Sequence, residues 1–308
     1  MKLLHKYVNG NCTVSLYDDG TKVREYPDGV VPAPIFPESM DVKITNRCSR
    51  DCGFCHERST PDGAHADIDK LLEVVKPLPA GVEIALGGGN VFEHPELLHL
   101  LLRLQLRGLV VNTTVKLEDA IEHEQELHHF QGLGLIHGLG ISVPSDMPHD
   151  SPKPLFANAN VVWHLIAGVN SVSDLASVQD LCRLWGIPCK VLVLGFKMRG
   201  KGIGFLVEHE QEVVTRLQQW RTTVARMLEE AGRLTLSFDN LALVTLSIKA
   251  CLSPEQWQKF YMGDDGQFTM YVDAVKQEYA RSSTSANCIA FDKAELRDYF
   301  KSLTQSLV

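Results

Sequence analysis

The stretch "DVKITNRCSRDCGFCHERST", residues 41–60, places three cysteines within eight positions, at Cys48, Cys52 and Cys55. The residues before them alternate polar and apolar side chains, which predicts a β-strand over residues 42–45. The residues after them carry several charges and predict a loop. Three thiolates on one short loop provide three soft ligands, so the spacing Cys-x3-Cys-x2-Cys indicates metal or redox chemistry at the end of a strand.

The composition limits the partners and the location that we expect for the chain. Its 308 residues are 44% hydrophobic, with 30 basic and 38 acidic side chains and a formal charge of −8. This balance argues against extended nucleic-acid binding, which depends on Lys and Arg against phosphates. No apolar run is long enough to cross a bilayer, and the start "MKLLHKYVNGNC" lacks the apolar core of a signal peptide. We therefore expect a cytoplasmic protein without a membrane partner, whose cysteines stay reduced.

Short apolar runs alternate with helical stretches from residue 41 onward, an order that is typical of βαβ units with a parallel sheet. Six or seven such repeats predict an α/β fold with a partial (β/α)6-type parallel barrel. A doubly wound open sheet is the alternative, because periodicity does not separate the two. The expected strands cover residues 42–45, 82–86, 109–114, 140–143, 161–166, 190–194 and 234–238. The expected helices cover residues 68–76, 95–107, 117–131, 172–185 and 208–230.

The two ends of the chain depart from this rhythm. Two alternating runs over residues 13–26, joined by an Asp-Asp-Gly turn, predict a β-hairpin, and a proline-rich strap follows it. After residue 250 we expect a helix start at Ser253 and a helix-like segment over 272–280. The proline-rich connection over 144–154 need not contain a full helix. The predicted divisions are a hairpin and strap (1–39), a barrel (40–250) and a C-terminal extension (251–308).

A [4Fe–4S] cluster has four irons, so three cysteine ligands leave one iron open to a small molecule. The trio, with Phe54 just before its last cysteine, resembles the Cys-x3-Cys-x-aromatic-Cys signature of the radical S-adenosylmethionine (radical SAM) superfamily. The resemblance implies that Cys48, Cys52 and Cys55 hold one [4Fe–4S] cluster, and that Phe54 lies beside the adenine of bound S-adenosylmethionine. It also implies that one electron cleaves this cofactor to methionine and a 5′-deoxyadenosyl radical, which abstracts hydrogen from a substrate. An external donor such as flavodoxin or ferredoxin is expected to supply the electron.

A second motif, "VEIALGGGNVFEHPEL" over residues 82–97, is a strand that runs into glycines. It resembles the Gly-Gly-Glu-Pro motif of the same family, although Gly89 and Asn90 replace the Glu and Pro. The resemblance implies that Gly87, Gly88, Gly89 and Asn90 contact the cofactor, and bare glycine amides suit such a close approach. Loops at the carboxyl ends of barrel strands form the site in such folds. By this analogy, further polar groups expected to contact the cofactor are Thr114, Ser142 and Lys197.

Cys288 is a candidate hydrogen donor for quenching a substrate radical, with a plain buried cysteine as the alternative. The late cysteines are too few for a second all-cysteine cluster, so one cluster is expected. We expect a peptide or protein segment as substrate, with a nucleotide or small metabolite as the alternative. An alternative hypothesis from a different class of protein is a non-catalytic zinc-binding module that uses Cys48, Cys52, Cys55 and His56. The adjacent Cys55 and His56 would strain tetrahedral ligation of the zinc.

Overall fold

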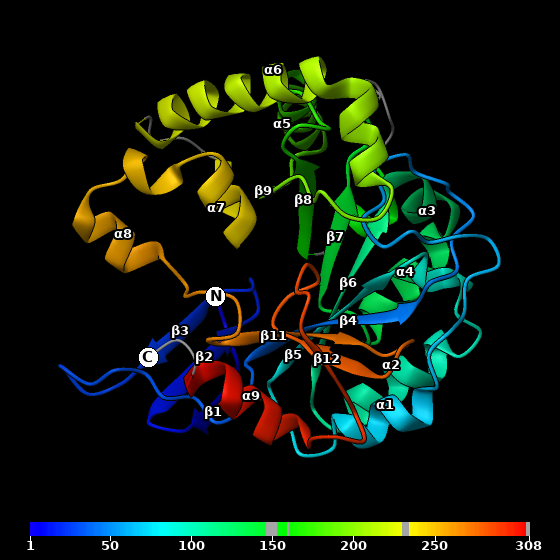
Figure 1. The fold of residues 1–308 in the computed structure, drawn as a ribbon, viewed down its shortest axis with the longest axis vertical. Helices are drawn as coiled ribbons and strands as arrows, with labels where there is room; N and C mark the ends of the chain where they lie inside the picture. Colours follow the sequence, from blue (N-terminus) through cyan, green and yellow to red (C-terminus); the bar gives the residue numbers. More distant parts are fainter. Residues whose placement is uncertain (146–152, 159, 230–233, 306–308) are drawn as a thin grey trace.

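One ten-stranded sheet forms the frame of the molecule (Figure 1). The computed structural model describes residues 1–145, 153–158, 160–229 and 234–305. From one edge to the other, the strands of this sheet are β10 (Leu234–Phe238), β9 (Cys189–Leu194), β8 (Asn160–Ile166), β7 (Gly138–Ser142), β6 (Val110–Lys116), β5 (Glu83–Gly88), β4 (Ser39–Thr45), β11 (Thr269–Asp273), β12 (Glu278–Ala280) and β13 (Cys288–Ala290).

The parallel part of the sheet is an open barrel. β4 to β10 follow one another in parallel, and β11 adds in parallel to the other side of β4. Within the described residues, the edge strands β10 and β13 do not pair with each other, so the barrel stays open on one side. The predicted partial barrel is therefore confirmed, and each of the seven predicted strands is present with bounds shifted by a few residues at most.

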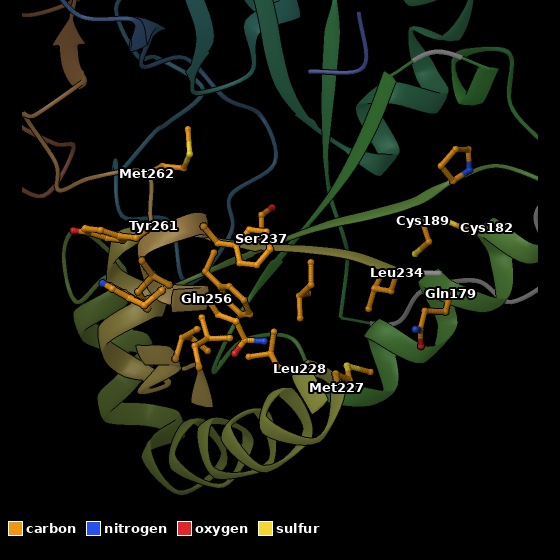
Figure 2. A pocket seen from close by; sticks show the side chains of 18 of the residues that line it. Gln179, Cys182, Cys189, Met227, Leu228, Leu234, Ser237, Gln256, Tyr261 and Met262 are labelled. Atoms are coloured by element: carbon orange, nitrogen blue, oxygen red, sulfur yellow. The ribbon is translucent and has the colours of Figure 1, made fainter. Parts of the chain in front are cut away.

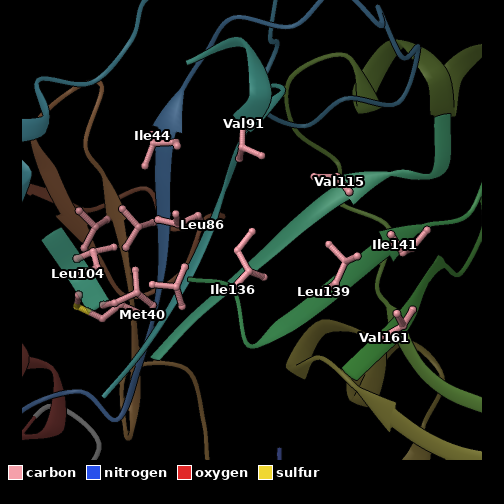
Figure 3. Packing of buried hydrophobic residues seen from close by; sticks show 14 of the residues in the cluster. Met40, Ile44, Leu86, Val91, Leu104, Val115, Ile136, Leu139, Ile141 and Val161 are labelled. Atoms are coloured by element: carbon pink, nitrogen blue, oxygen red, sulfur yellow. The ribbon is translucent and has the colours of Figure 1, made fainter. Parts of the chain in front are cut away.

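The outward side chains of the strands build the hydrophobic core. Met40 and Ile44 of β4 and Leu86 of β5 are buried beneath the helices (Figure 3). Because successive side chains alternate across a strand, Asp41 and Lys43 point to the opposite face, into the barrel. A strand with apolar residues on one face and charged residues on the other thus places its polar groups inside the barrel, where a ligand can meet them.

Helices cover the outside of the barrel (Figure 1). The predicted helix over 172–185 has the observed bounds, because Ser171 and Asp174 form a capping box and Gly186, with φ 66°, ends it. The predicted helix over 117–131 is two helices that meet at His123. The helices are α1 (Ile68–Val74), α2 (Leu97–Leu106), α3 (Leu117–Glu122), α4 (Glu124–Gly132), α5 (Val172–Trp185), α6 (Gly202–Glu229), α7 (Asn240–Thr245), α8 (Pro254–Phe260) and α9 (Leu296–Gln305), with short 3-10 helices η1 (Val91–Glu93), η2 (Leu155–Asn158) and η3 (Ile248–Cys251).

A separate three-stranded sheet, β1 (Leu3–Asn9), β2 (Cys12–Tyr17) and β3 (Lys22–Glu25), covers the amino-terminal ends of the barrel strands. It contains the predicted hairpin and one additional strand, β1. Lys22 Nζ lies 2.6 Å from Glu83 Oε2, and Arg24 Nε lies 2.8 Å from Glu38 Oε2. Glu38 is fully buried, so the sheet is attached by charges that water cannot solvate.

The C-terminal region corrects one prediction. The segment over 272–280 is not helical: it contains the end of β11 and the strand β12, with Gln277 at φ 59° in the turn between them. The predicted helix start at Ser253 is confirmed, since its side chain caps α8. The division at residue 251 stays a prediction, although the barrel sheet continues across it through β11. Most of the proline-rich connection over 144–154 lies outside the described residues.

Candidate functional site

The three predicted cluster ligands lie on the loop between β4 and α1, at the carboxyl end of β4. Cys48 N donates to Thr60 O at 2.9 Å, and Cys55 N donates to Cys52 O at 3.1 Å. All three thiols are free and half-buried, and burial raises the pKa of the Cys48 thiol. The backbone therefore fixes three accessible thiols on one loop, which is a suitable donor set for an iron–sulfur cluster.

The glycine turn after β5 packs directly on this cysteine loop. Gly89 N donates to Thr45 O at 2.7 Å, and Asn90 N donates to Arg47 O at 2.8 Å. A Cβ atom at Gly89 would lie 2.0 Å from Arg47 O, so a larger residue there would push the two segments apart. The close approach explains why the usual carboxylate of the motif has no room at this position.

The other residues of the turn have different surroundings. Gly88 has φ 122°, a conformation that favours glycine, whereas a Cβ at Gly87 would meet nothing within 4 Å. The Asn90 side chain is already engaged: its Oδ1 accepts from Phe92 N at 3.1 Å and its Nδ2 donates to Asp119 Oδ1 at 3.0 Å. Gly87 thus offers accessible backbone, while the Asn90 side chain holds the turn in place.

A buried ionic network attaches the cysteine loop to two strands. Lys43 Nζ lies 2.8 Å from Glu57 Oε2 and 3.4 Å from Asp273 Oδ2, and Tyr271 OH donates to Glu57 Oε1 at 3.0 Å. Burial alone lowers the pKa of Lys43, but the two carboxylates outweigh it and raise that pKa above its usual value. The sequence analysis missed this network; a charged residue at an inward position of "DVKIT" was the available signal.

The segment after β9 lies against the same loop. Lys201 N donates to Cys55 O at 2.9 Å. Lys197 Nζ donates to Ser283 Oγ at 2.8 Å and lies 3.4 Å from His56 Nε2, and Arg199 Nη1 donates to two carbonyl oxygens of the C-terminal region. Lys197 therefore lies at the predicted rim, but its ammonium group already has a protein partner.

Polar side chains from three neighbouring strands meet on the inner wall. A Cβ at Gly140 would lie 2.7 Å from His164 Nε2 and 2.8 Å from Thr114 Oγ1, so the missing side chain makes room for the imidazole. Burial lowers the pKa of His164 to about 4, which keeps the ring neutral at pH 7. Ser142 pairs in register with His164 at the end of β7. The predicted contacts Thr114 and Ser142 thus share one wall.

Two predicted residues occupy different places. The Phe54 ring meets Phe205 of α6 edge-on, with centroids 5.9 Å apart, and is half-buried beside the cysteines. Cys288 is exposed on β13, the edge strand separated from β4 by β11 and β12. The structure therefore brings Phe54 to the site and places Cys288 on the edge strand, in register with Asp41 through Ala280 and Tyr271.

The alternative of a zinc ion requires Cys48, Cys52, Cys55 and His56 to converge on one point. In the part of the chain that the structure describes, no group of three or more His, Cys, Asp or Glu side chains is arranged to hold a single metal ion. His56 Nε2 lies 3.3 Å from Glu57 Oε1 instead. In this structure the imidazole of His56 therefore faces a carboxylate of the ionic network.

A cavity of about 1030 Å³ lies elsewhere, between β10, α6 and α8 (Figure 2). Its wall is mainly apolar, with Leu234 and Leu228 as examples, and none of the three cluster cysteines lines it. The buried Cys182 and the half-buried Cys189 line one end. Size alone does not make this cavity the reaction site, because the reactive groups lie at the cysteine loop.

The comparison with protein families agrees with this placement. Residues 42–187 match the family model described as the Radical SAM superfamily, and this range contains the second half of β4, the cysteine loop and the glycine turn. Residues 42–187 therefore form a radical SAM domain. Such a domain indicates an enzyme. No curated protein sequence matches it.

Solved structures of a Streptococcus suis protein share the fold of this radical SAM protein. SuiB bound to the precursor peptide SuiA has 13% sequence identity and a TM-score of 0.58, covering 89% of this chain and 67% of that chain. SuiB bound to S-adenosylmethionine has 12% identity and a TM-score of 0.57, covering 89% of this chain and 68% of that chain. At this identity the likeness establishes the fold alone. Among the described residues, no helix is long and apolar enough to span a membrane.

Proposed function

We propose that this radical SAM enzyme cleaves S-adenosylmethionine reductively at one [4Fe–4S] cluster held by Cys48, Cys52 and Cys55. The observation that carries the proposal is the position of these three half-buried thiols, on one loop at the carboxyl end of a strand inside the radical SAM domain. When bound, the cluster supplies the single electron that converts S-adenosylmethionine to methionine and a 5′-deoxyadenosyl radical. Superfamily membership implies both cofactors, whereas the number of clusters is part of the proposal.

The side chains of the barrel then have defined tasks. The accessible Gly87 backbone and the hydroxyls of Thr114 and Ser142 offer hydrogen bonds to the polar groups of S-adenosylmethionine. The salt bridge between Lys43 and Glu57 holds the cysteine loop at a fixed height above the barrel. The sheet β1–β3 is attached by ion pairs to Glu83 and Glu38, at the amino-terminal ends of β5 and β4, opposite the cysteine loop.

For the substrate we propose a peptide or protein segment. SuiB, which shares the fold, binds a precursor peptide. The inner wall of this chain also carries an acidic group, Asp41, whose side chain is accessible to water. A carboxylate in that position favours a substrate with a basic group, such as a lysine or arginine side chain.

Anaerobic reconstitution tests the proposal. The protein should take up iron and sulfide in near-equal amounts, turn brown, and form 5′-deoxyadenosine from S-adenosylmethionine after reduction with dithionite. Cys52→Ala should lose both the cluster and 5′-deoxyadenosine formation, whereas Cys251→Ala, which changes a cysteine far from the loop, should keep both. A colourless protein with one zinc would support the non-catalytic alternative, and a loaded cluster that yields no 5′-deoxyadenosine would exclude turnover.

A further inference from the structure

The apolar cavity of about 1030 Å³ is bounded on one side by the edge strand β10 (Figure 2). Four of the five residues of this strand line the cavity, namely Leu234, Leu236, Ser237 and Phe238. In the described part of the chain β10 pairs with β9 alone, so its other edge has no partner strand. None of the five residues is buried, so the strand is accessible from the cavity.

The backbone of β10 presents unpaired hydrogen-bonding groups at this free edge. Successive residues of a strand direct their N–H and C=O groups alternately to one neighbouring strand and to the other. Asp239 N donates to Val193 O of β9 at 3.1 Å. By this alternation, the N–H and C=O groups of Leu236 and Phe238 point away from β9. A free row of such groups pairs readily with another extended chain.

The opposite wall of the cavity is apolar and open to water. It comes from α8 and the residues that follow this helix, with Trp257, Phe260 and Met262 among the lining side chains. No residue of α8 is buried. Phe260 is 62% exposed and Met262 is 49% exposed. Large apolar side chains left open around a hollow are typical of a surface that a partner covers.

The charge of the lining indicates the chemistry of the occupant. The residues that line the cavity include no Asp or Glu and one basic residue, Arg183, which is paired with Asp180. A charged occupant would lose its water here without gaining an opposite charge, which costs free energy. The wall therefore fits an uncharged, apolar chain, and the free strand edge fits a peptide backbone.

Strand β10 leads from this cavity to the rim of the candidate site. Asp239, the residue after the strand, accepts from Gly195 N at 2.9 Å. Gly195 lies two positions before Lys197 in the chain. Lys197 Nζ in turn lies 3.4 Å from His56 Nε2, and His56 follows Cys55 directly. A peptide that pairs with β10 and continues past its carboxyl end is thus directed to the rim that the cysteine loop shares.

We propose that this cavity binds an uncharged, apolar segment of the peptide substrate, in extended conformation, as a further strand on the free edge of β10. The inference rests on the proposed peptide substrate and names the place outside the barrel interior where it is held. Five residues of partner strand, about 17 Å of chain, match the length of β10. An acyl chain would also fit the apolar wall, but it would leave the peptide groups of Leu236 and Phe238 without a partner.

Binding of a defined probe to the full-length protein tests the inference. The probe is a hexapeptide of alternating valine and threonine, blocked at both ends and labelled with fluorescein through a polyethylene glycol spacer. Two further probes carry N-methyl groups on the valine amides or on the threonine amides, so each lacks the donors of one strand edge. Fluorescence anisotropy should show that at least one methylated probe binds about tenfold more weakly than the parent, because strand pairing needs those donors.

A pair of matched variants locates the binding site. Phe260→Asp introduces a charge into the apolar wall at an already exposed position, and should weaken binding of the parent probe at least about tenfold. Val244→Asp is the control, because Val244 is 77% exposed on α7 and does not line the cavity. It should bind the probe as the wild type does. Both variants should form 5′-deoxyadenosine with dithionite at the wild-type rate after reconstitution.

Four results would overturn the inference. The first is no binding of the parent probe at about 1 mM. The second is equal affinity for the parent and both methylated probes, which would show that the backbone is not paired. The third is an equal effect of Phe260→Asp and Val244→Asp. The fourth is binding of fluorescent dodecanoate that Phe260→Asp abolishes while peptide binding persists, which would assign the cavity to an acyl chain. Absence of 5′-deoxyadenosine from the wild type would instead be a failure of the proposed function, since probe binding does not require the cluster.

Discussion

His164 shows how its surroundings set the chemistry of one residue. Its ring occupies the space that Gly140 leaves open, and burial is the one cause that lowers its pKa, to about 4. In the unfolded chain a histidine takes up its proton near pH 6.5. Between these values the unfolded state binds more protons, so stability rises with pH and is lost as the pH falls.

We therefore expect the free energy of unfolding of the metal-free protein to fall by about 1–3 kcal/mol more than that of His164→Gln between pH 7 and pH 4.5, at 1.36 kcal/mol per pKa unit as an upper limit. Urea denaturation of both proteins across this range measures the difference. Parallel pH curves for the two proteins would show that His164 titrates normally in the folded state.

Gly89 shows the effect of a single missing side chain. A Cβ there would lie 2.0 Å from the carbonyl oxygen of Arg47, in the loop that carries the cysteines. Gly89→Ala should shift this loop and lower the iron content after reconstitution to less than about half, with a stability cost of about 1–3 kcal/mol. Gly132→Ala is the matched control, because a Cβ at Gly132 would meet nothing within 4 Å. Equal iron content in the two variants would contradict this role.

At the scale of elements, the amino-terminal sheet is joined to the barrel by a buried ion pair. Arg24 Nε lies 2.8 Å from Glu38 Oε2, and its guanidinium also lies 3.6 Å from the ring centroid of Phe268. Arg24→Met should cost about 3–5 kcal/mol, because it leaves the fully buried carboxylate of Glu38 without a partner. The double variant Arg24→Met, Glu38→Gln should regain part of this loss.

Thermal or urea denaturation of the two single variants and the double variant measures the coupling. Lys6→Met gives the baseline, since Lys6 and Glu25 form an exposed pair on the same sheet, worth about 0–1 kcal/mol. Strictly additive losses would mean that Arg24 and Glu38 act independently, against their close contact.

Whether a helix or strand can be predicted from the sequence depends on whether its signals are local. The helix over 172–185 and the strand over 234–238 carry local signals, a capping box in one case and alternating apolar side chains in the other. The segment over 272–280 carries a misleading local signal, which predicts a helix. It forms strands instead, because β11 pairs with β4, more than 200 residues away. Local periodicity contains no information about such a partner.

The residues of the candidate site also divide into those with a local sequence signal and those without one. Cys48, Cys52 and Cys55 are recognisable because their spacing is local, and the glycine turn because it follows a strand. The contact of Tyr271 with Glu57 joins residues 214 positions apart, so only the folded chain reveals it. Cys288 is a candidate for its thiol chemistry alone; the register places it on the edge strand, on the face that Asp41 and Tyr271 share, and its role stays a prediction.

At the scale of the whole molecule, Lys43 ties together three regions of the chain. Its ammonium group, on β4 and 4% exposed, contacts Glu57 in the cysteine loop and Asp273 on β11. The C-terminal region is thereby part of the support of the cysteine loop. The metal-free protein should consequently unfold in one cooperative transition that includes both the barrel and β11.

Lys43→Met tests this coupling. It removes the buried ammonium group that Glu57 and Asp273 share and leaves Asp273 only the exposed Lys276 at 3.8 Å, so we expect a loss of about 3–5 kcal/mol and a lower iron content after reconstitution. Lys116→Met is the matched control: Lys116 lies on β6 of the same barrel, with a partly exposed ion pair to Glu118 worth about 0–1 kcal/mol. Circular dichroism and tryptophan fluorescence in urea, with iron analysis, measure both effects. If Lys43→Met behaves like Lys116→Met, or if the C-terminal region melts in a transition of its own, then the cysteine loop does not depend on the strand that the extension adds to the barrel.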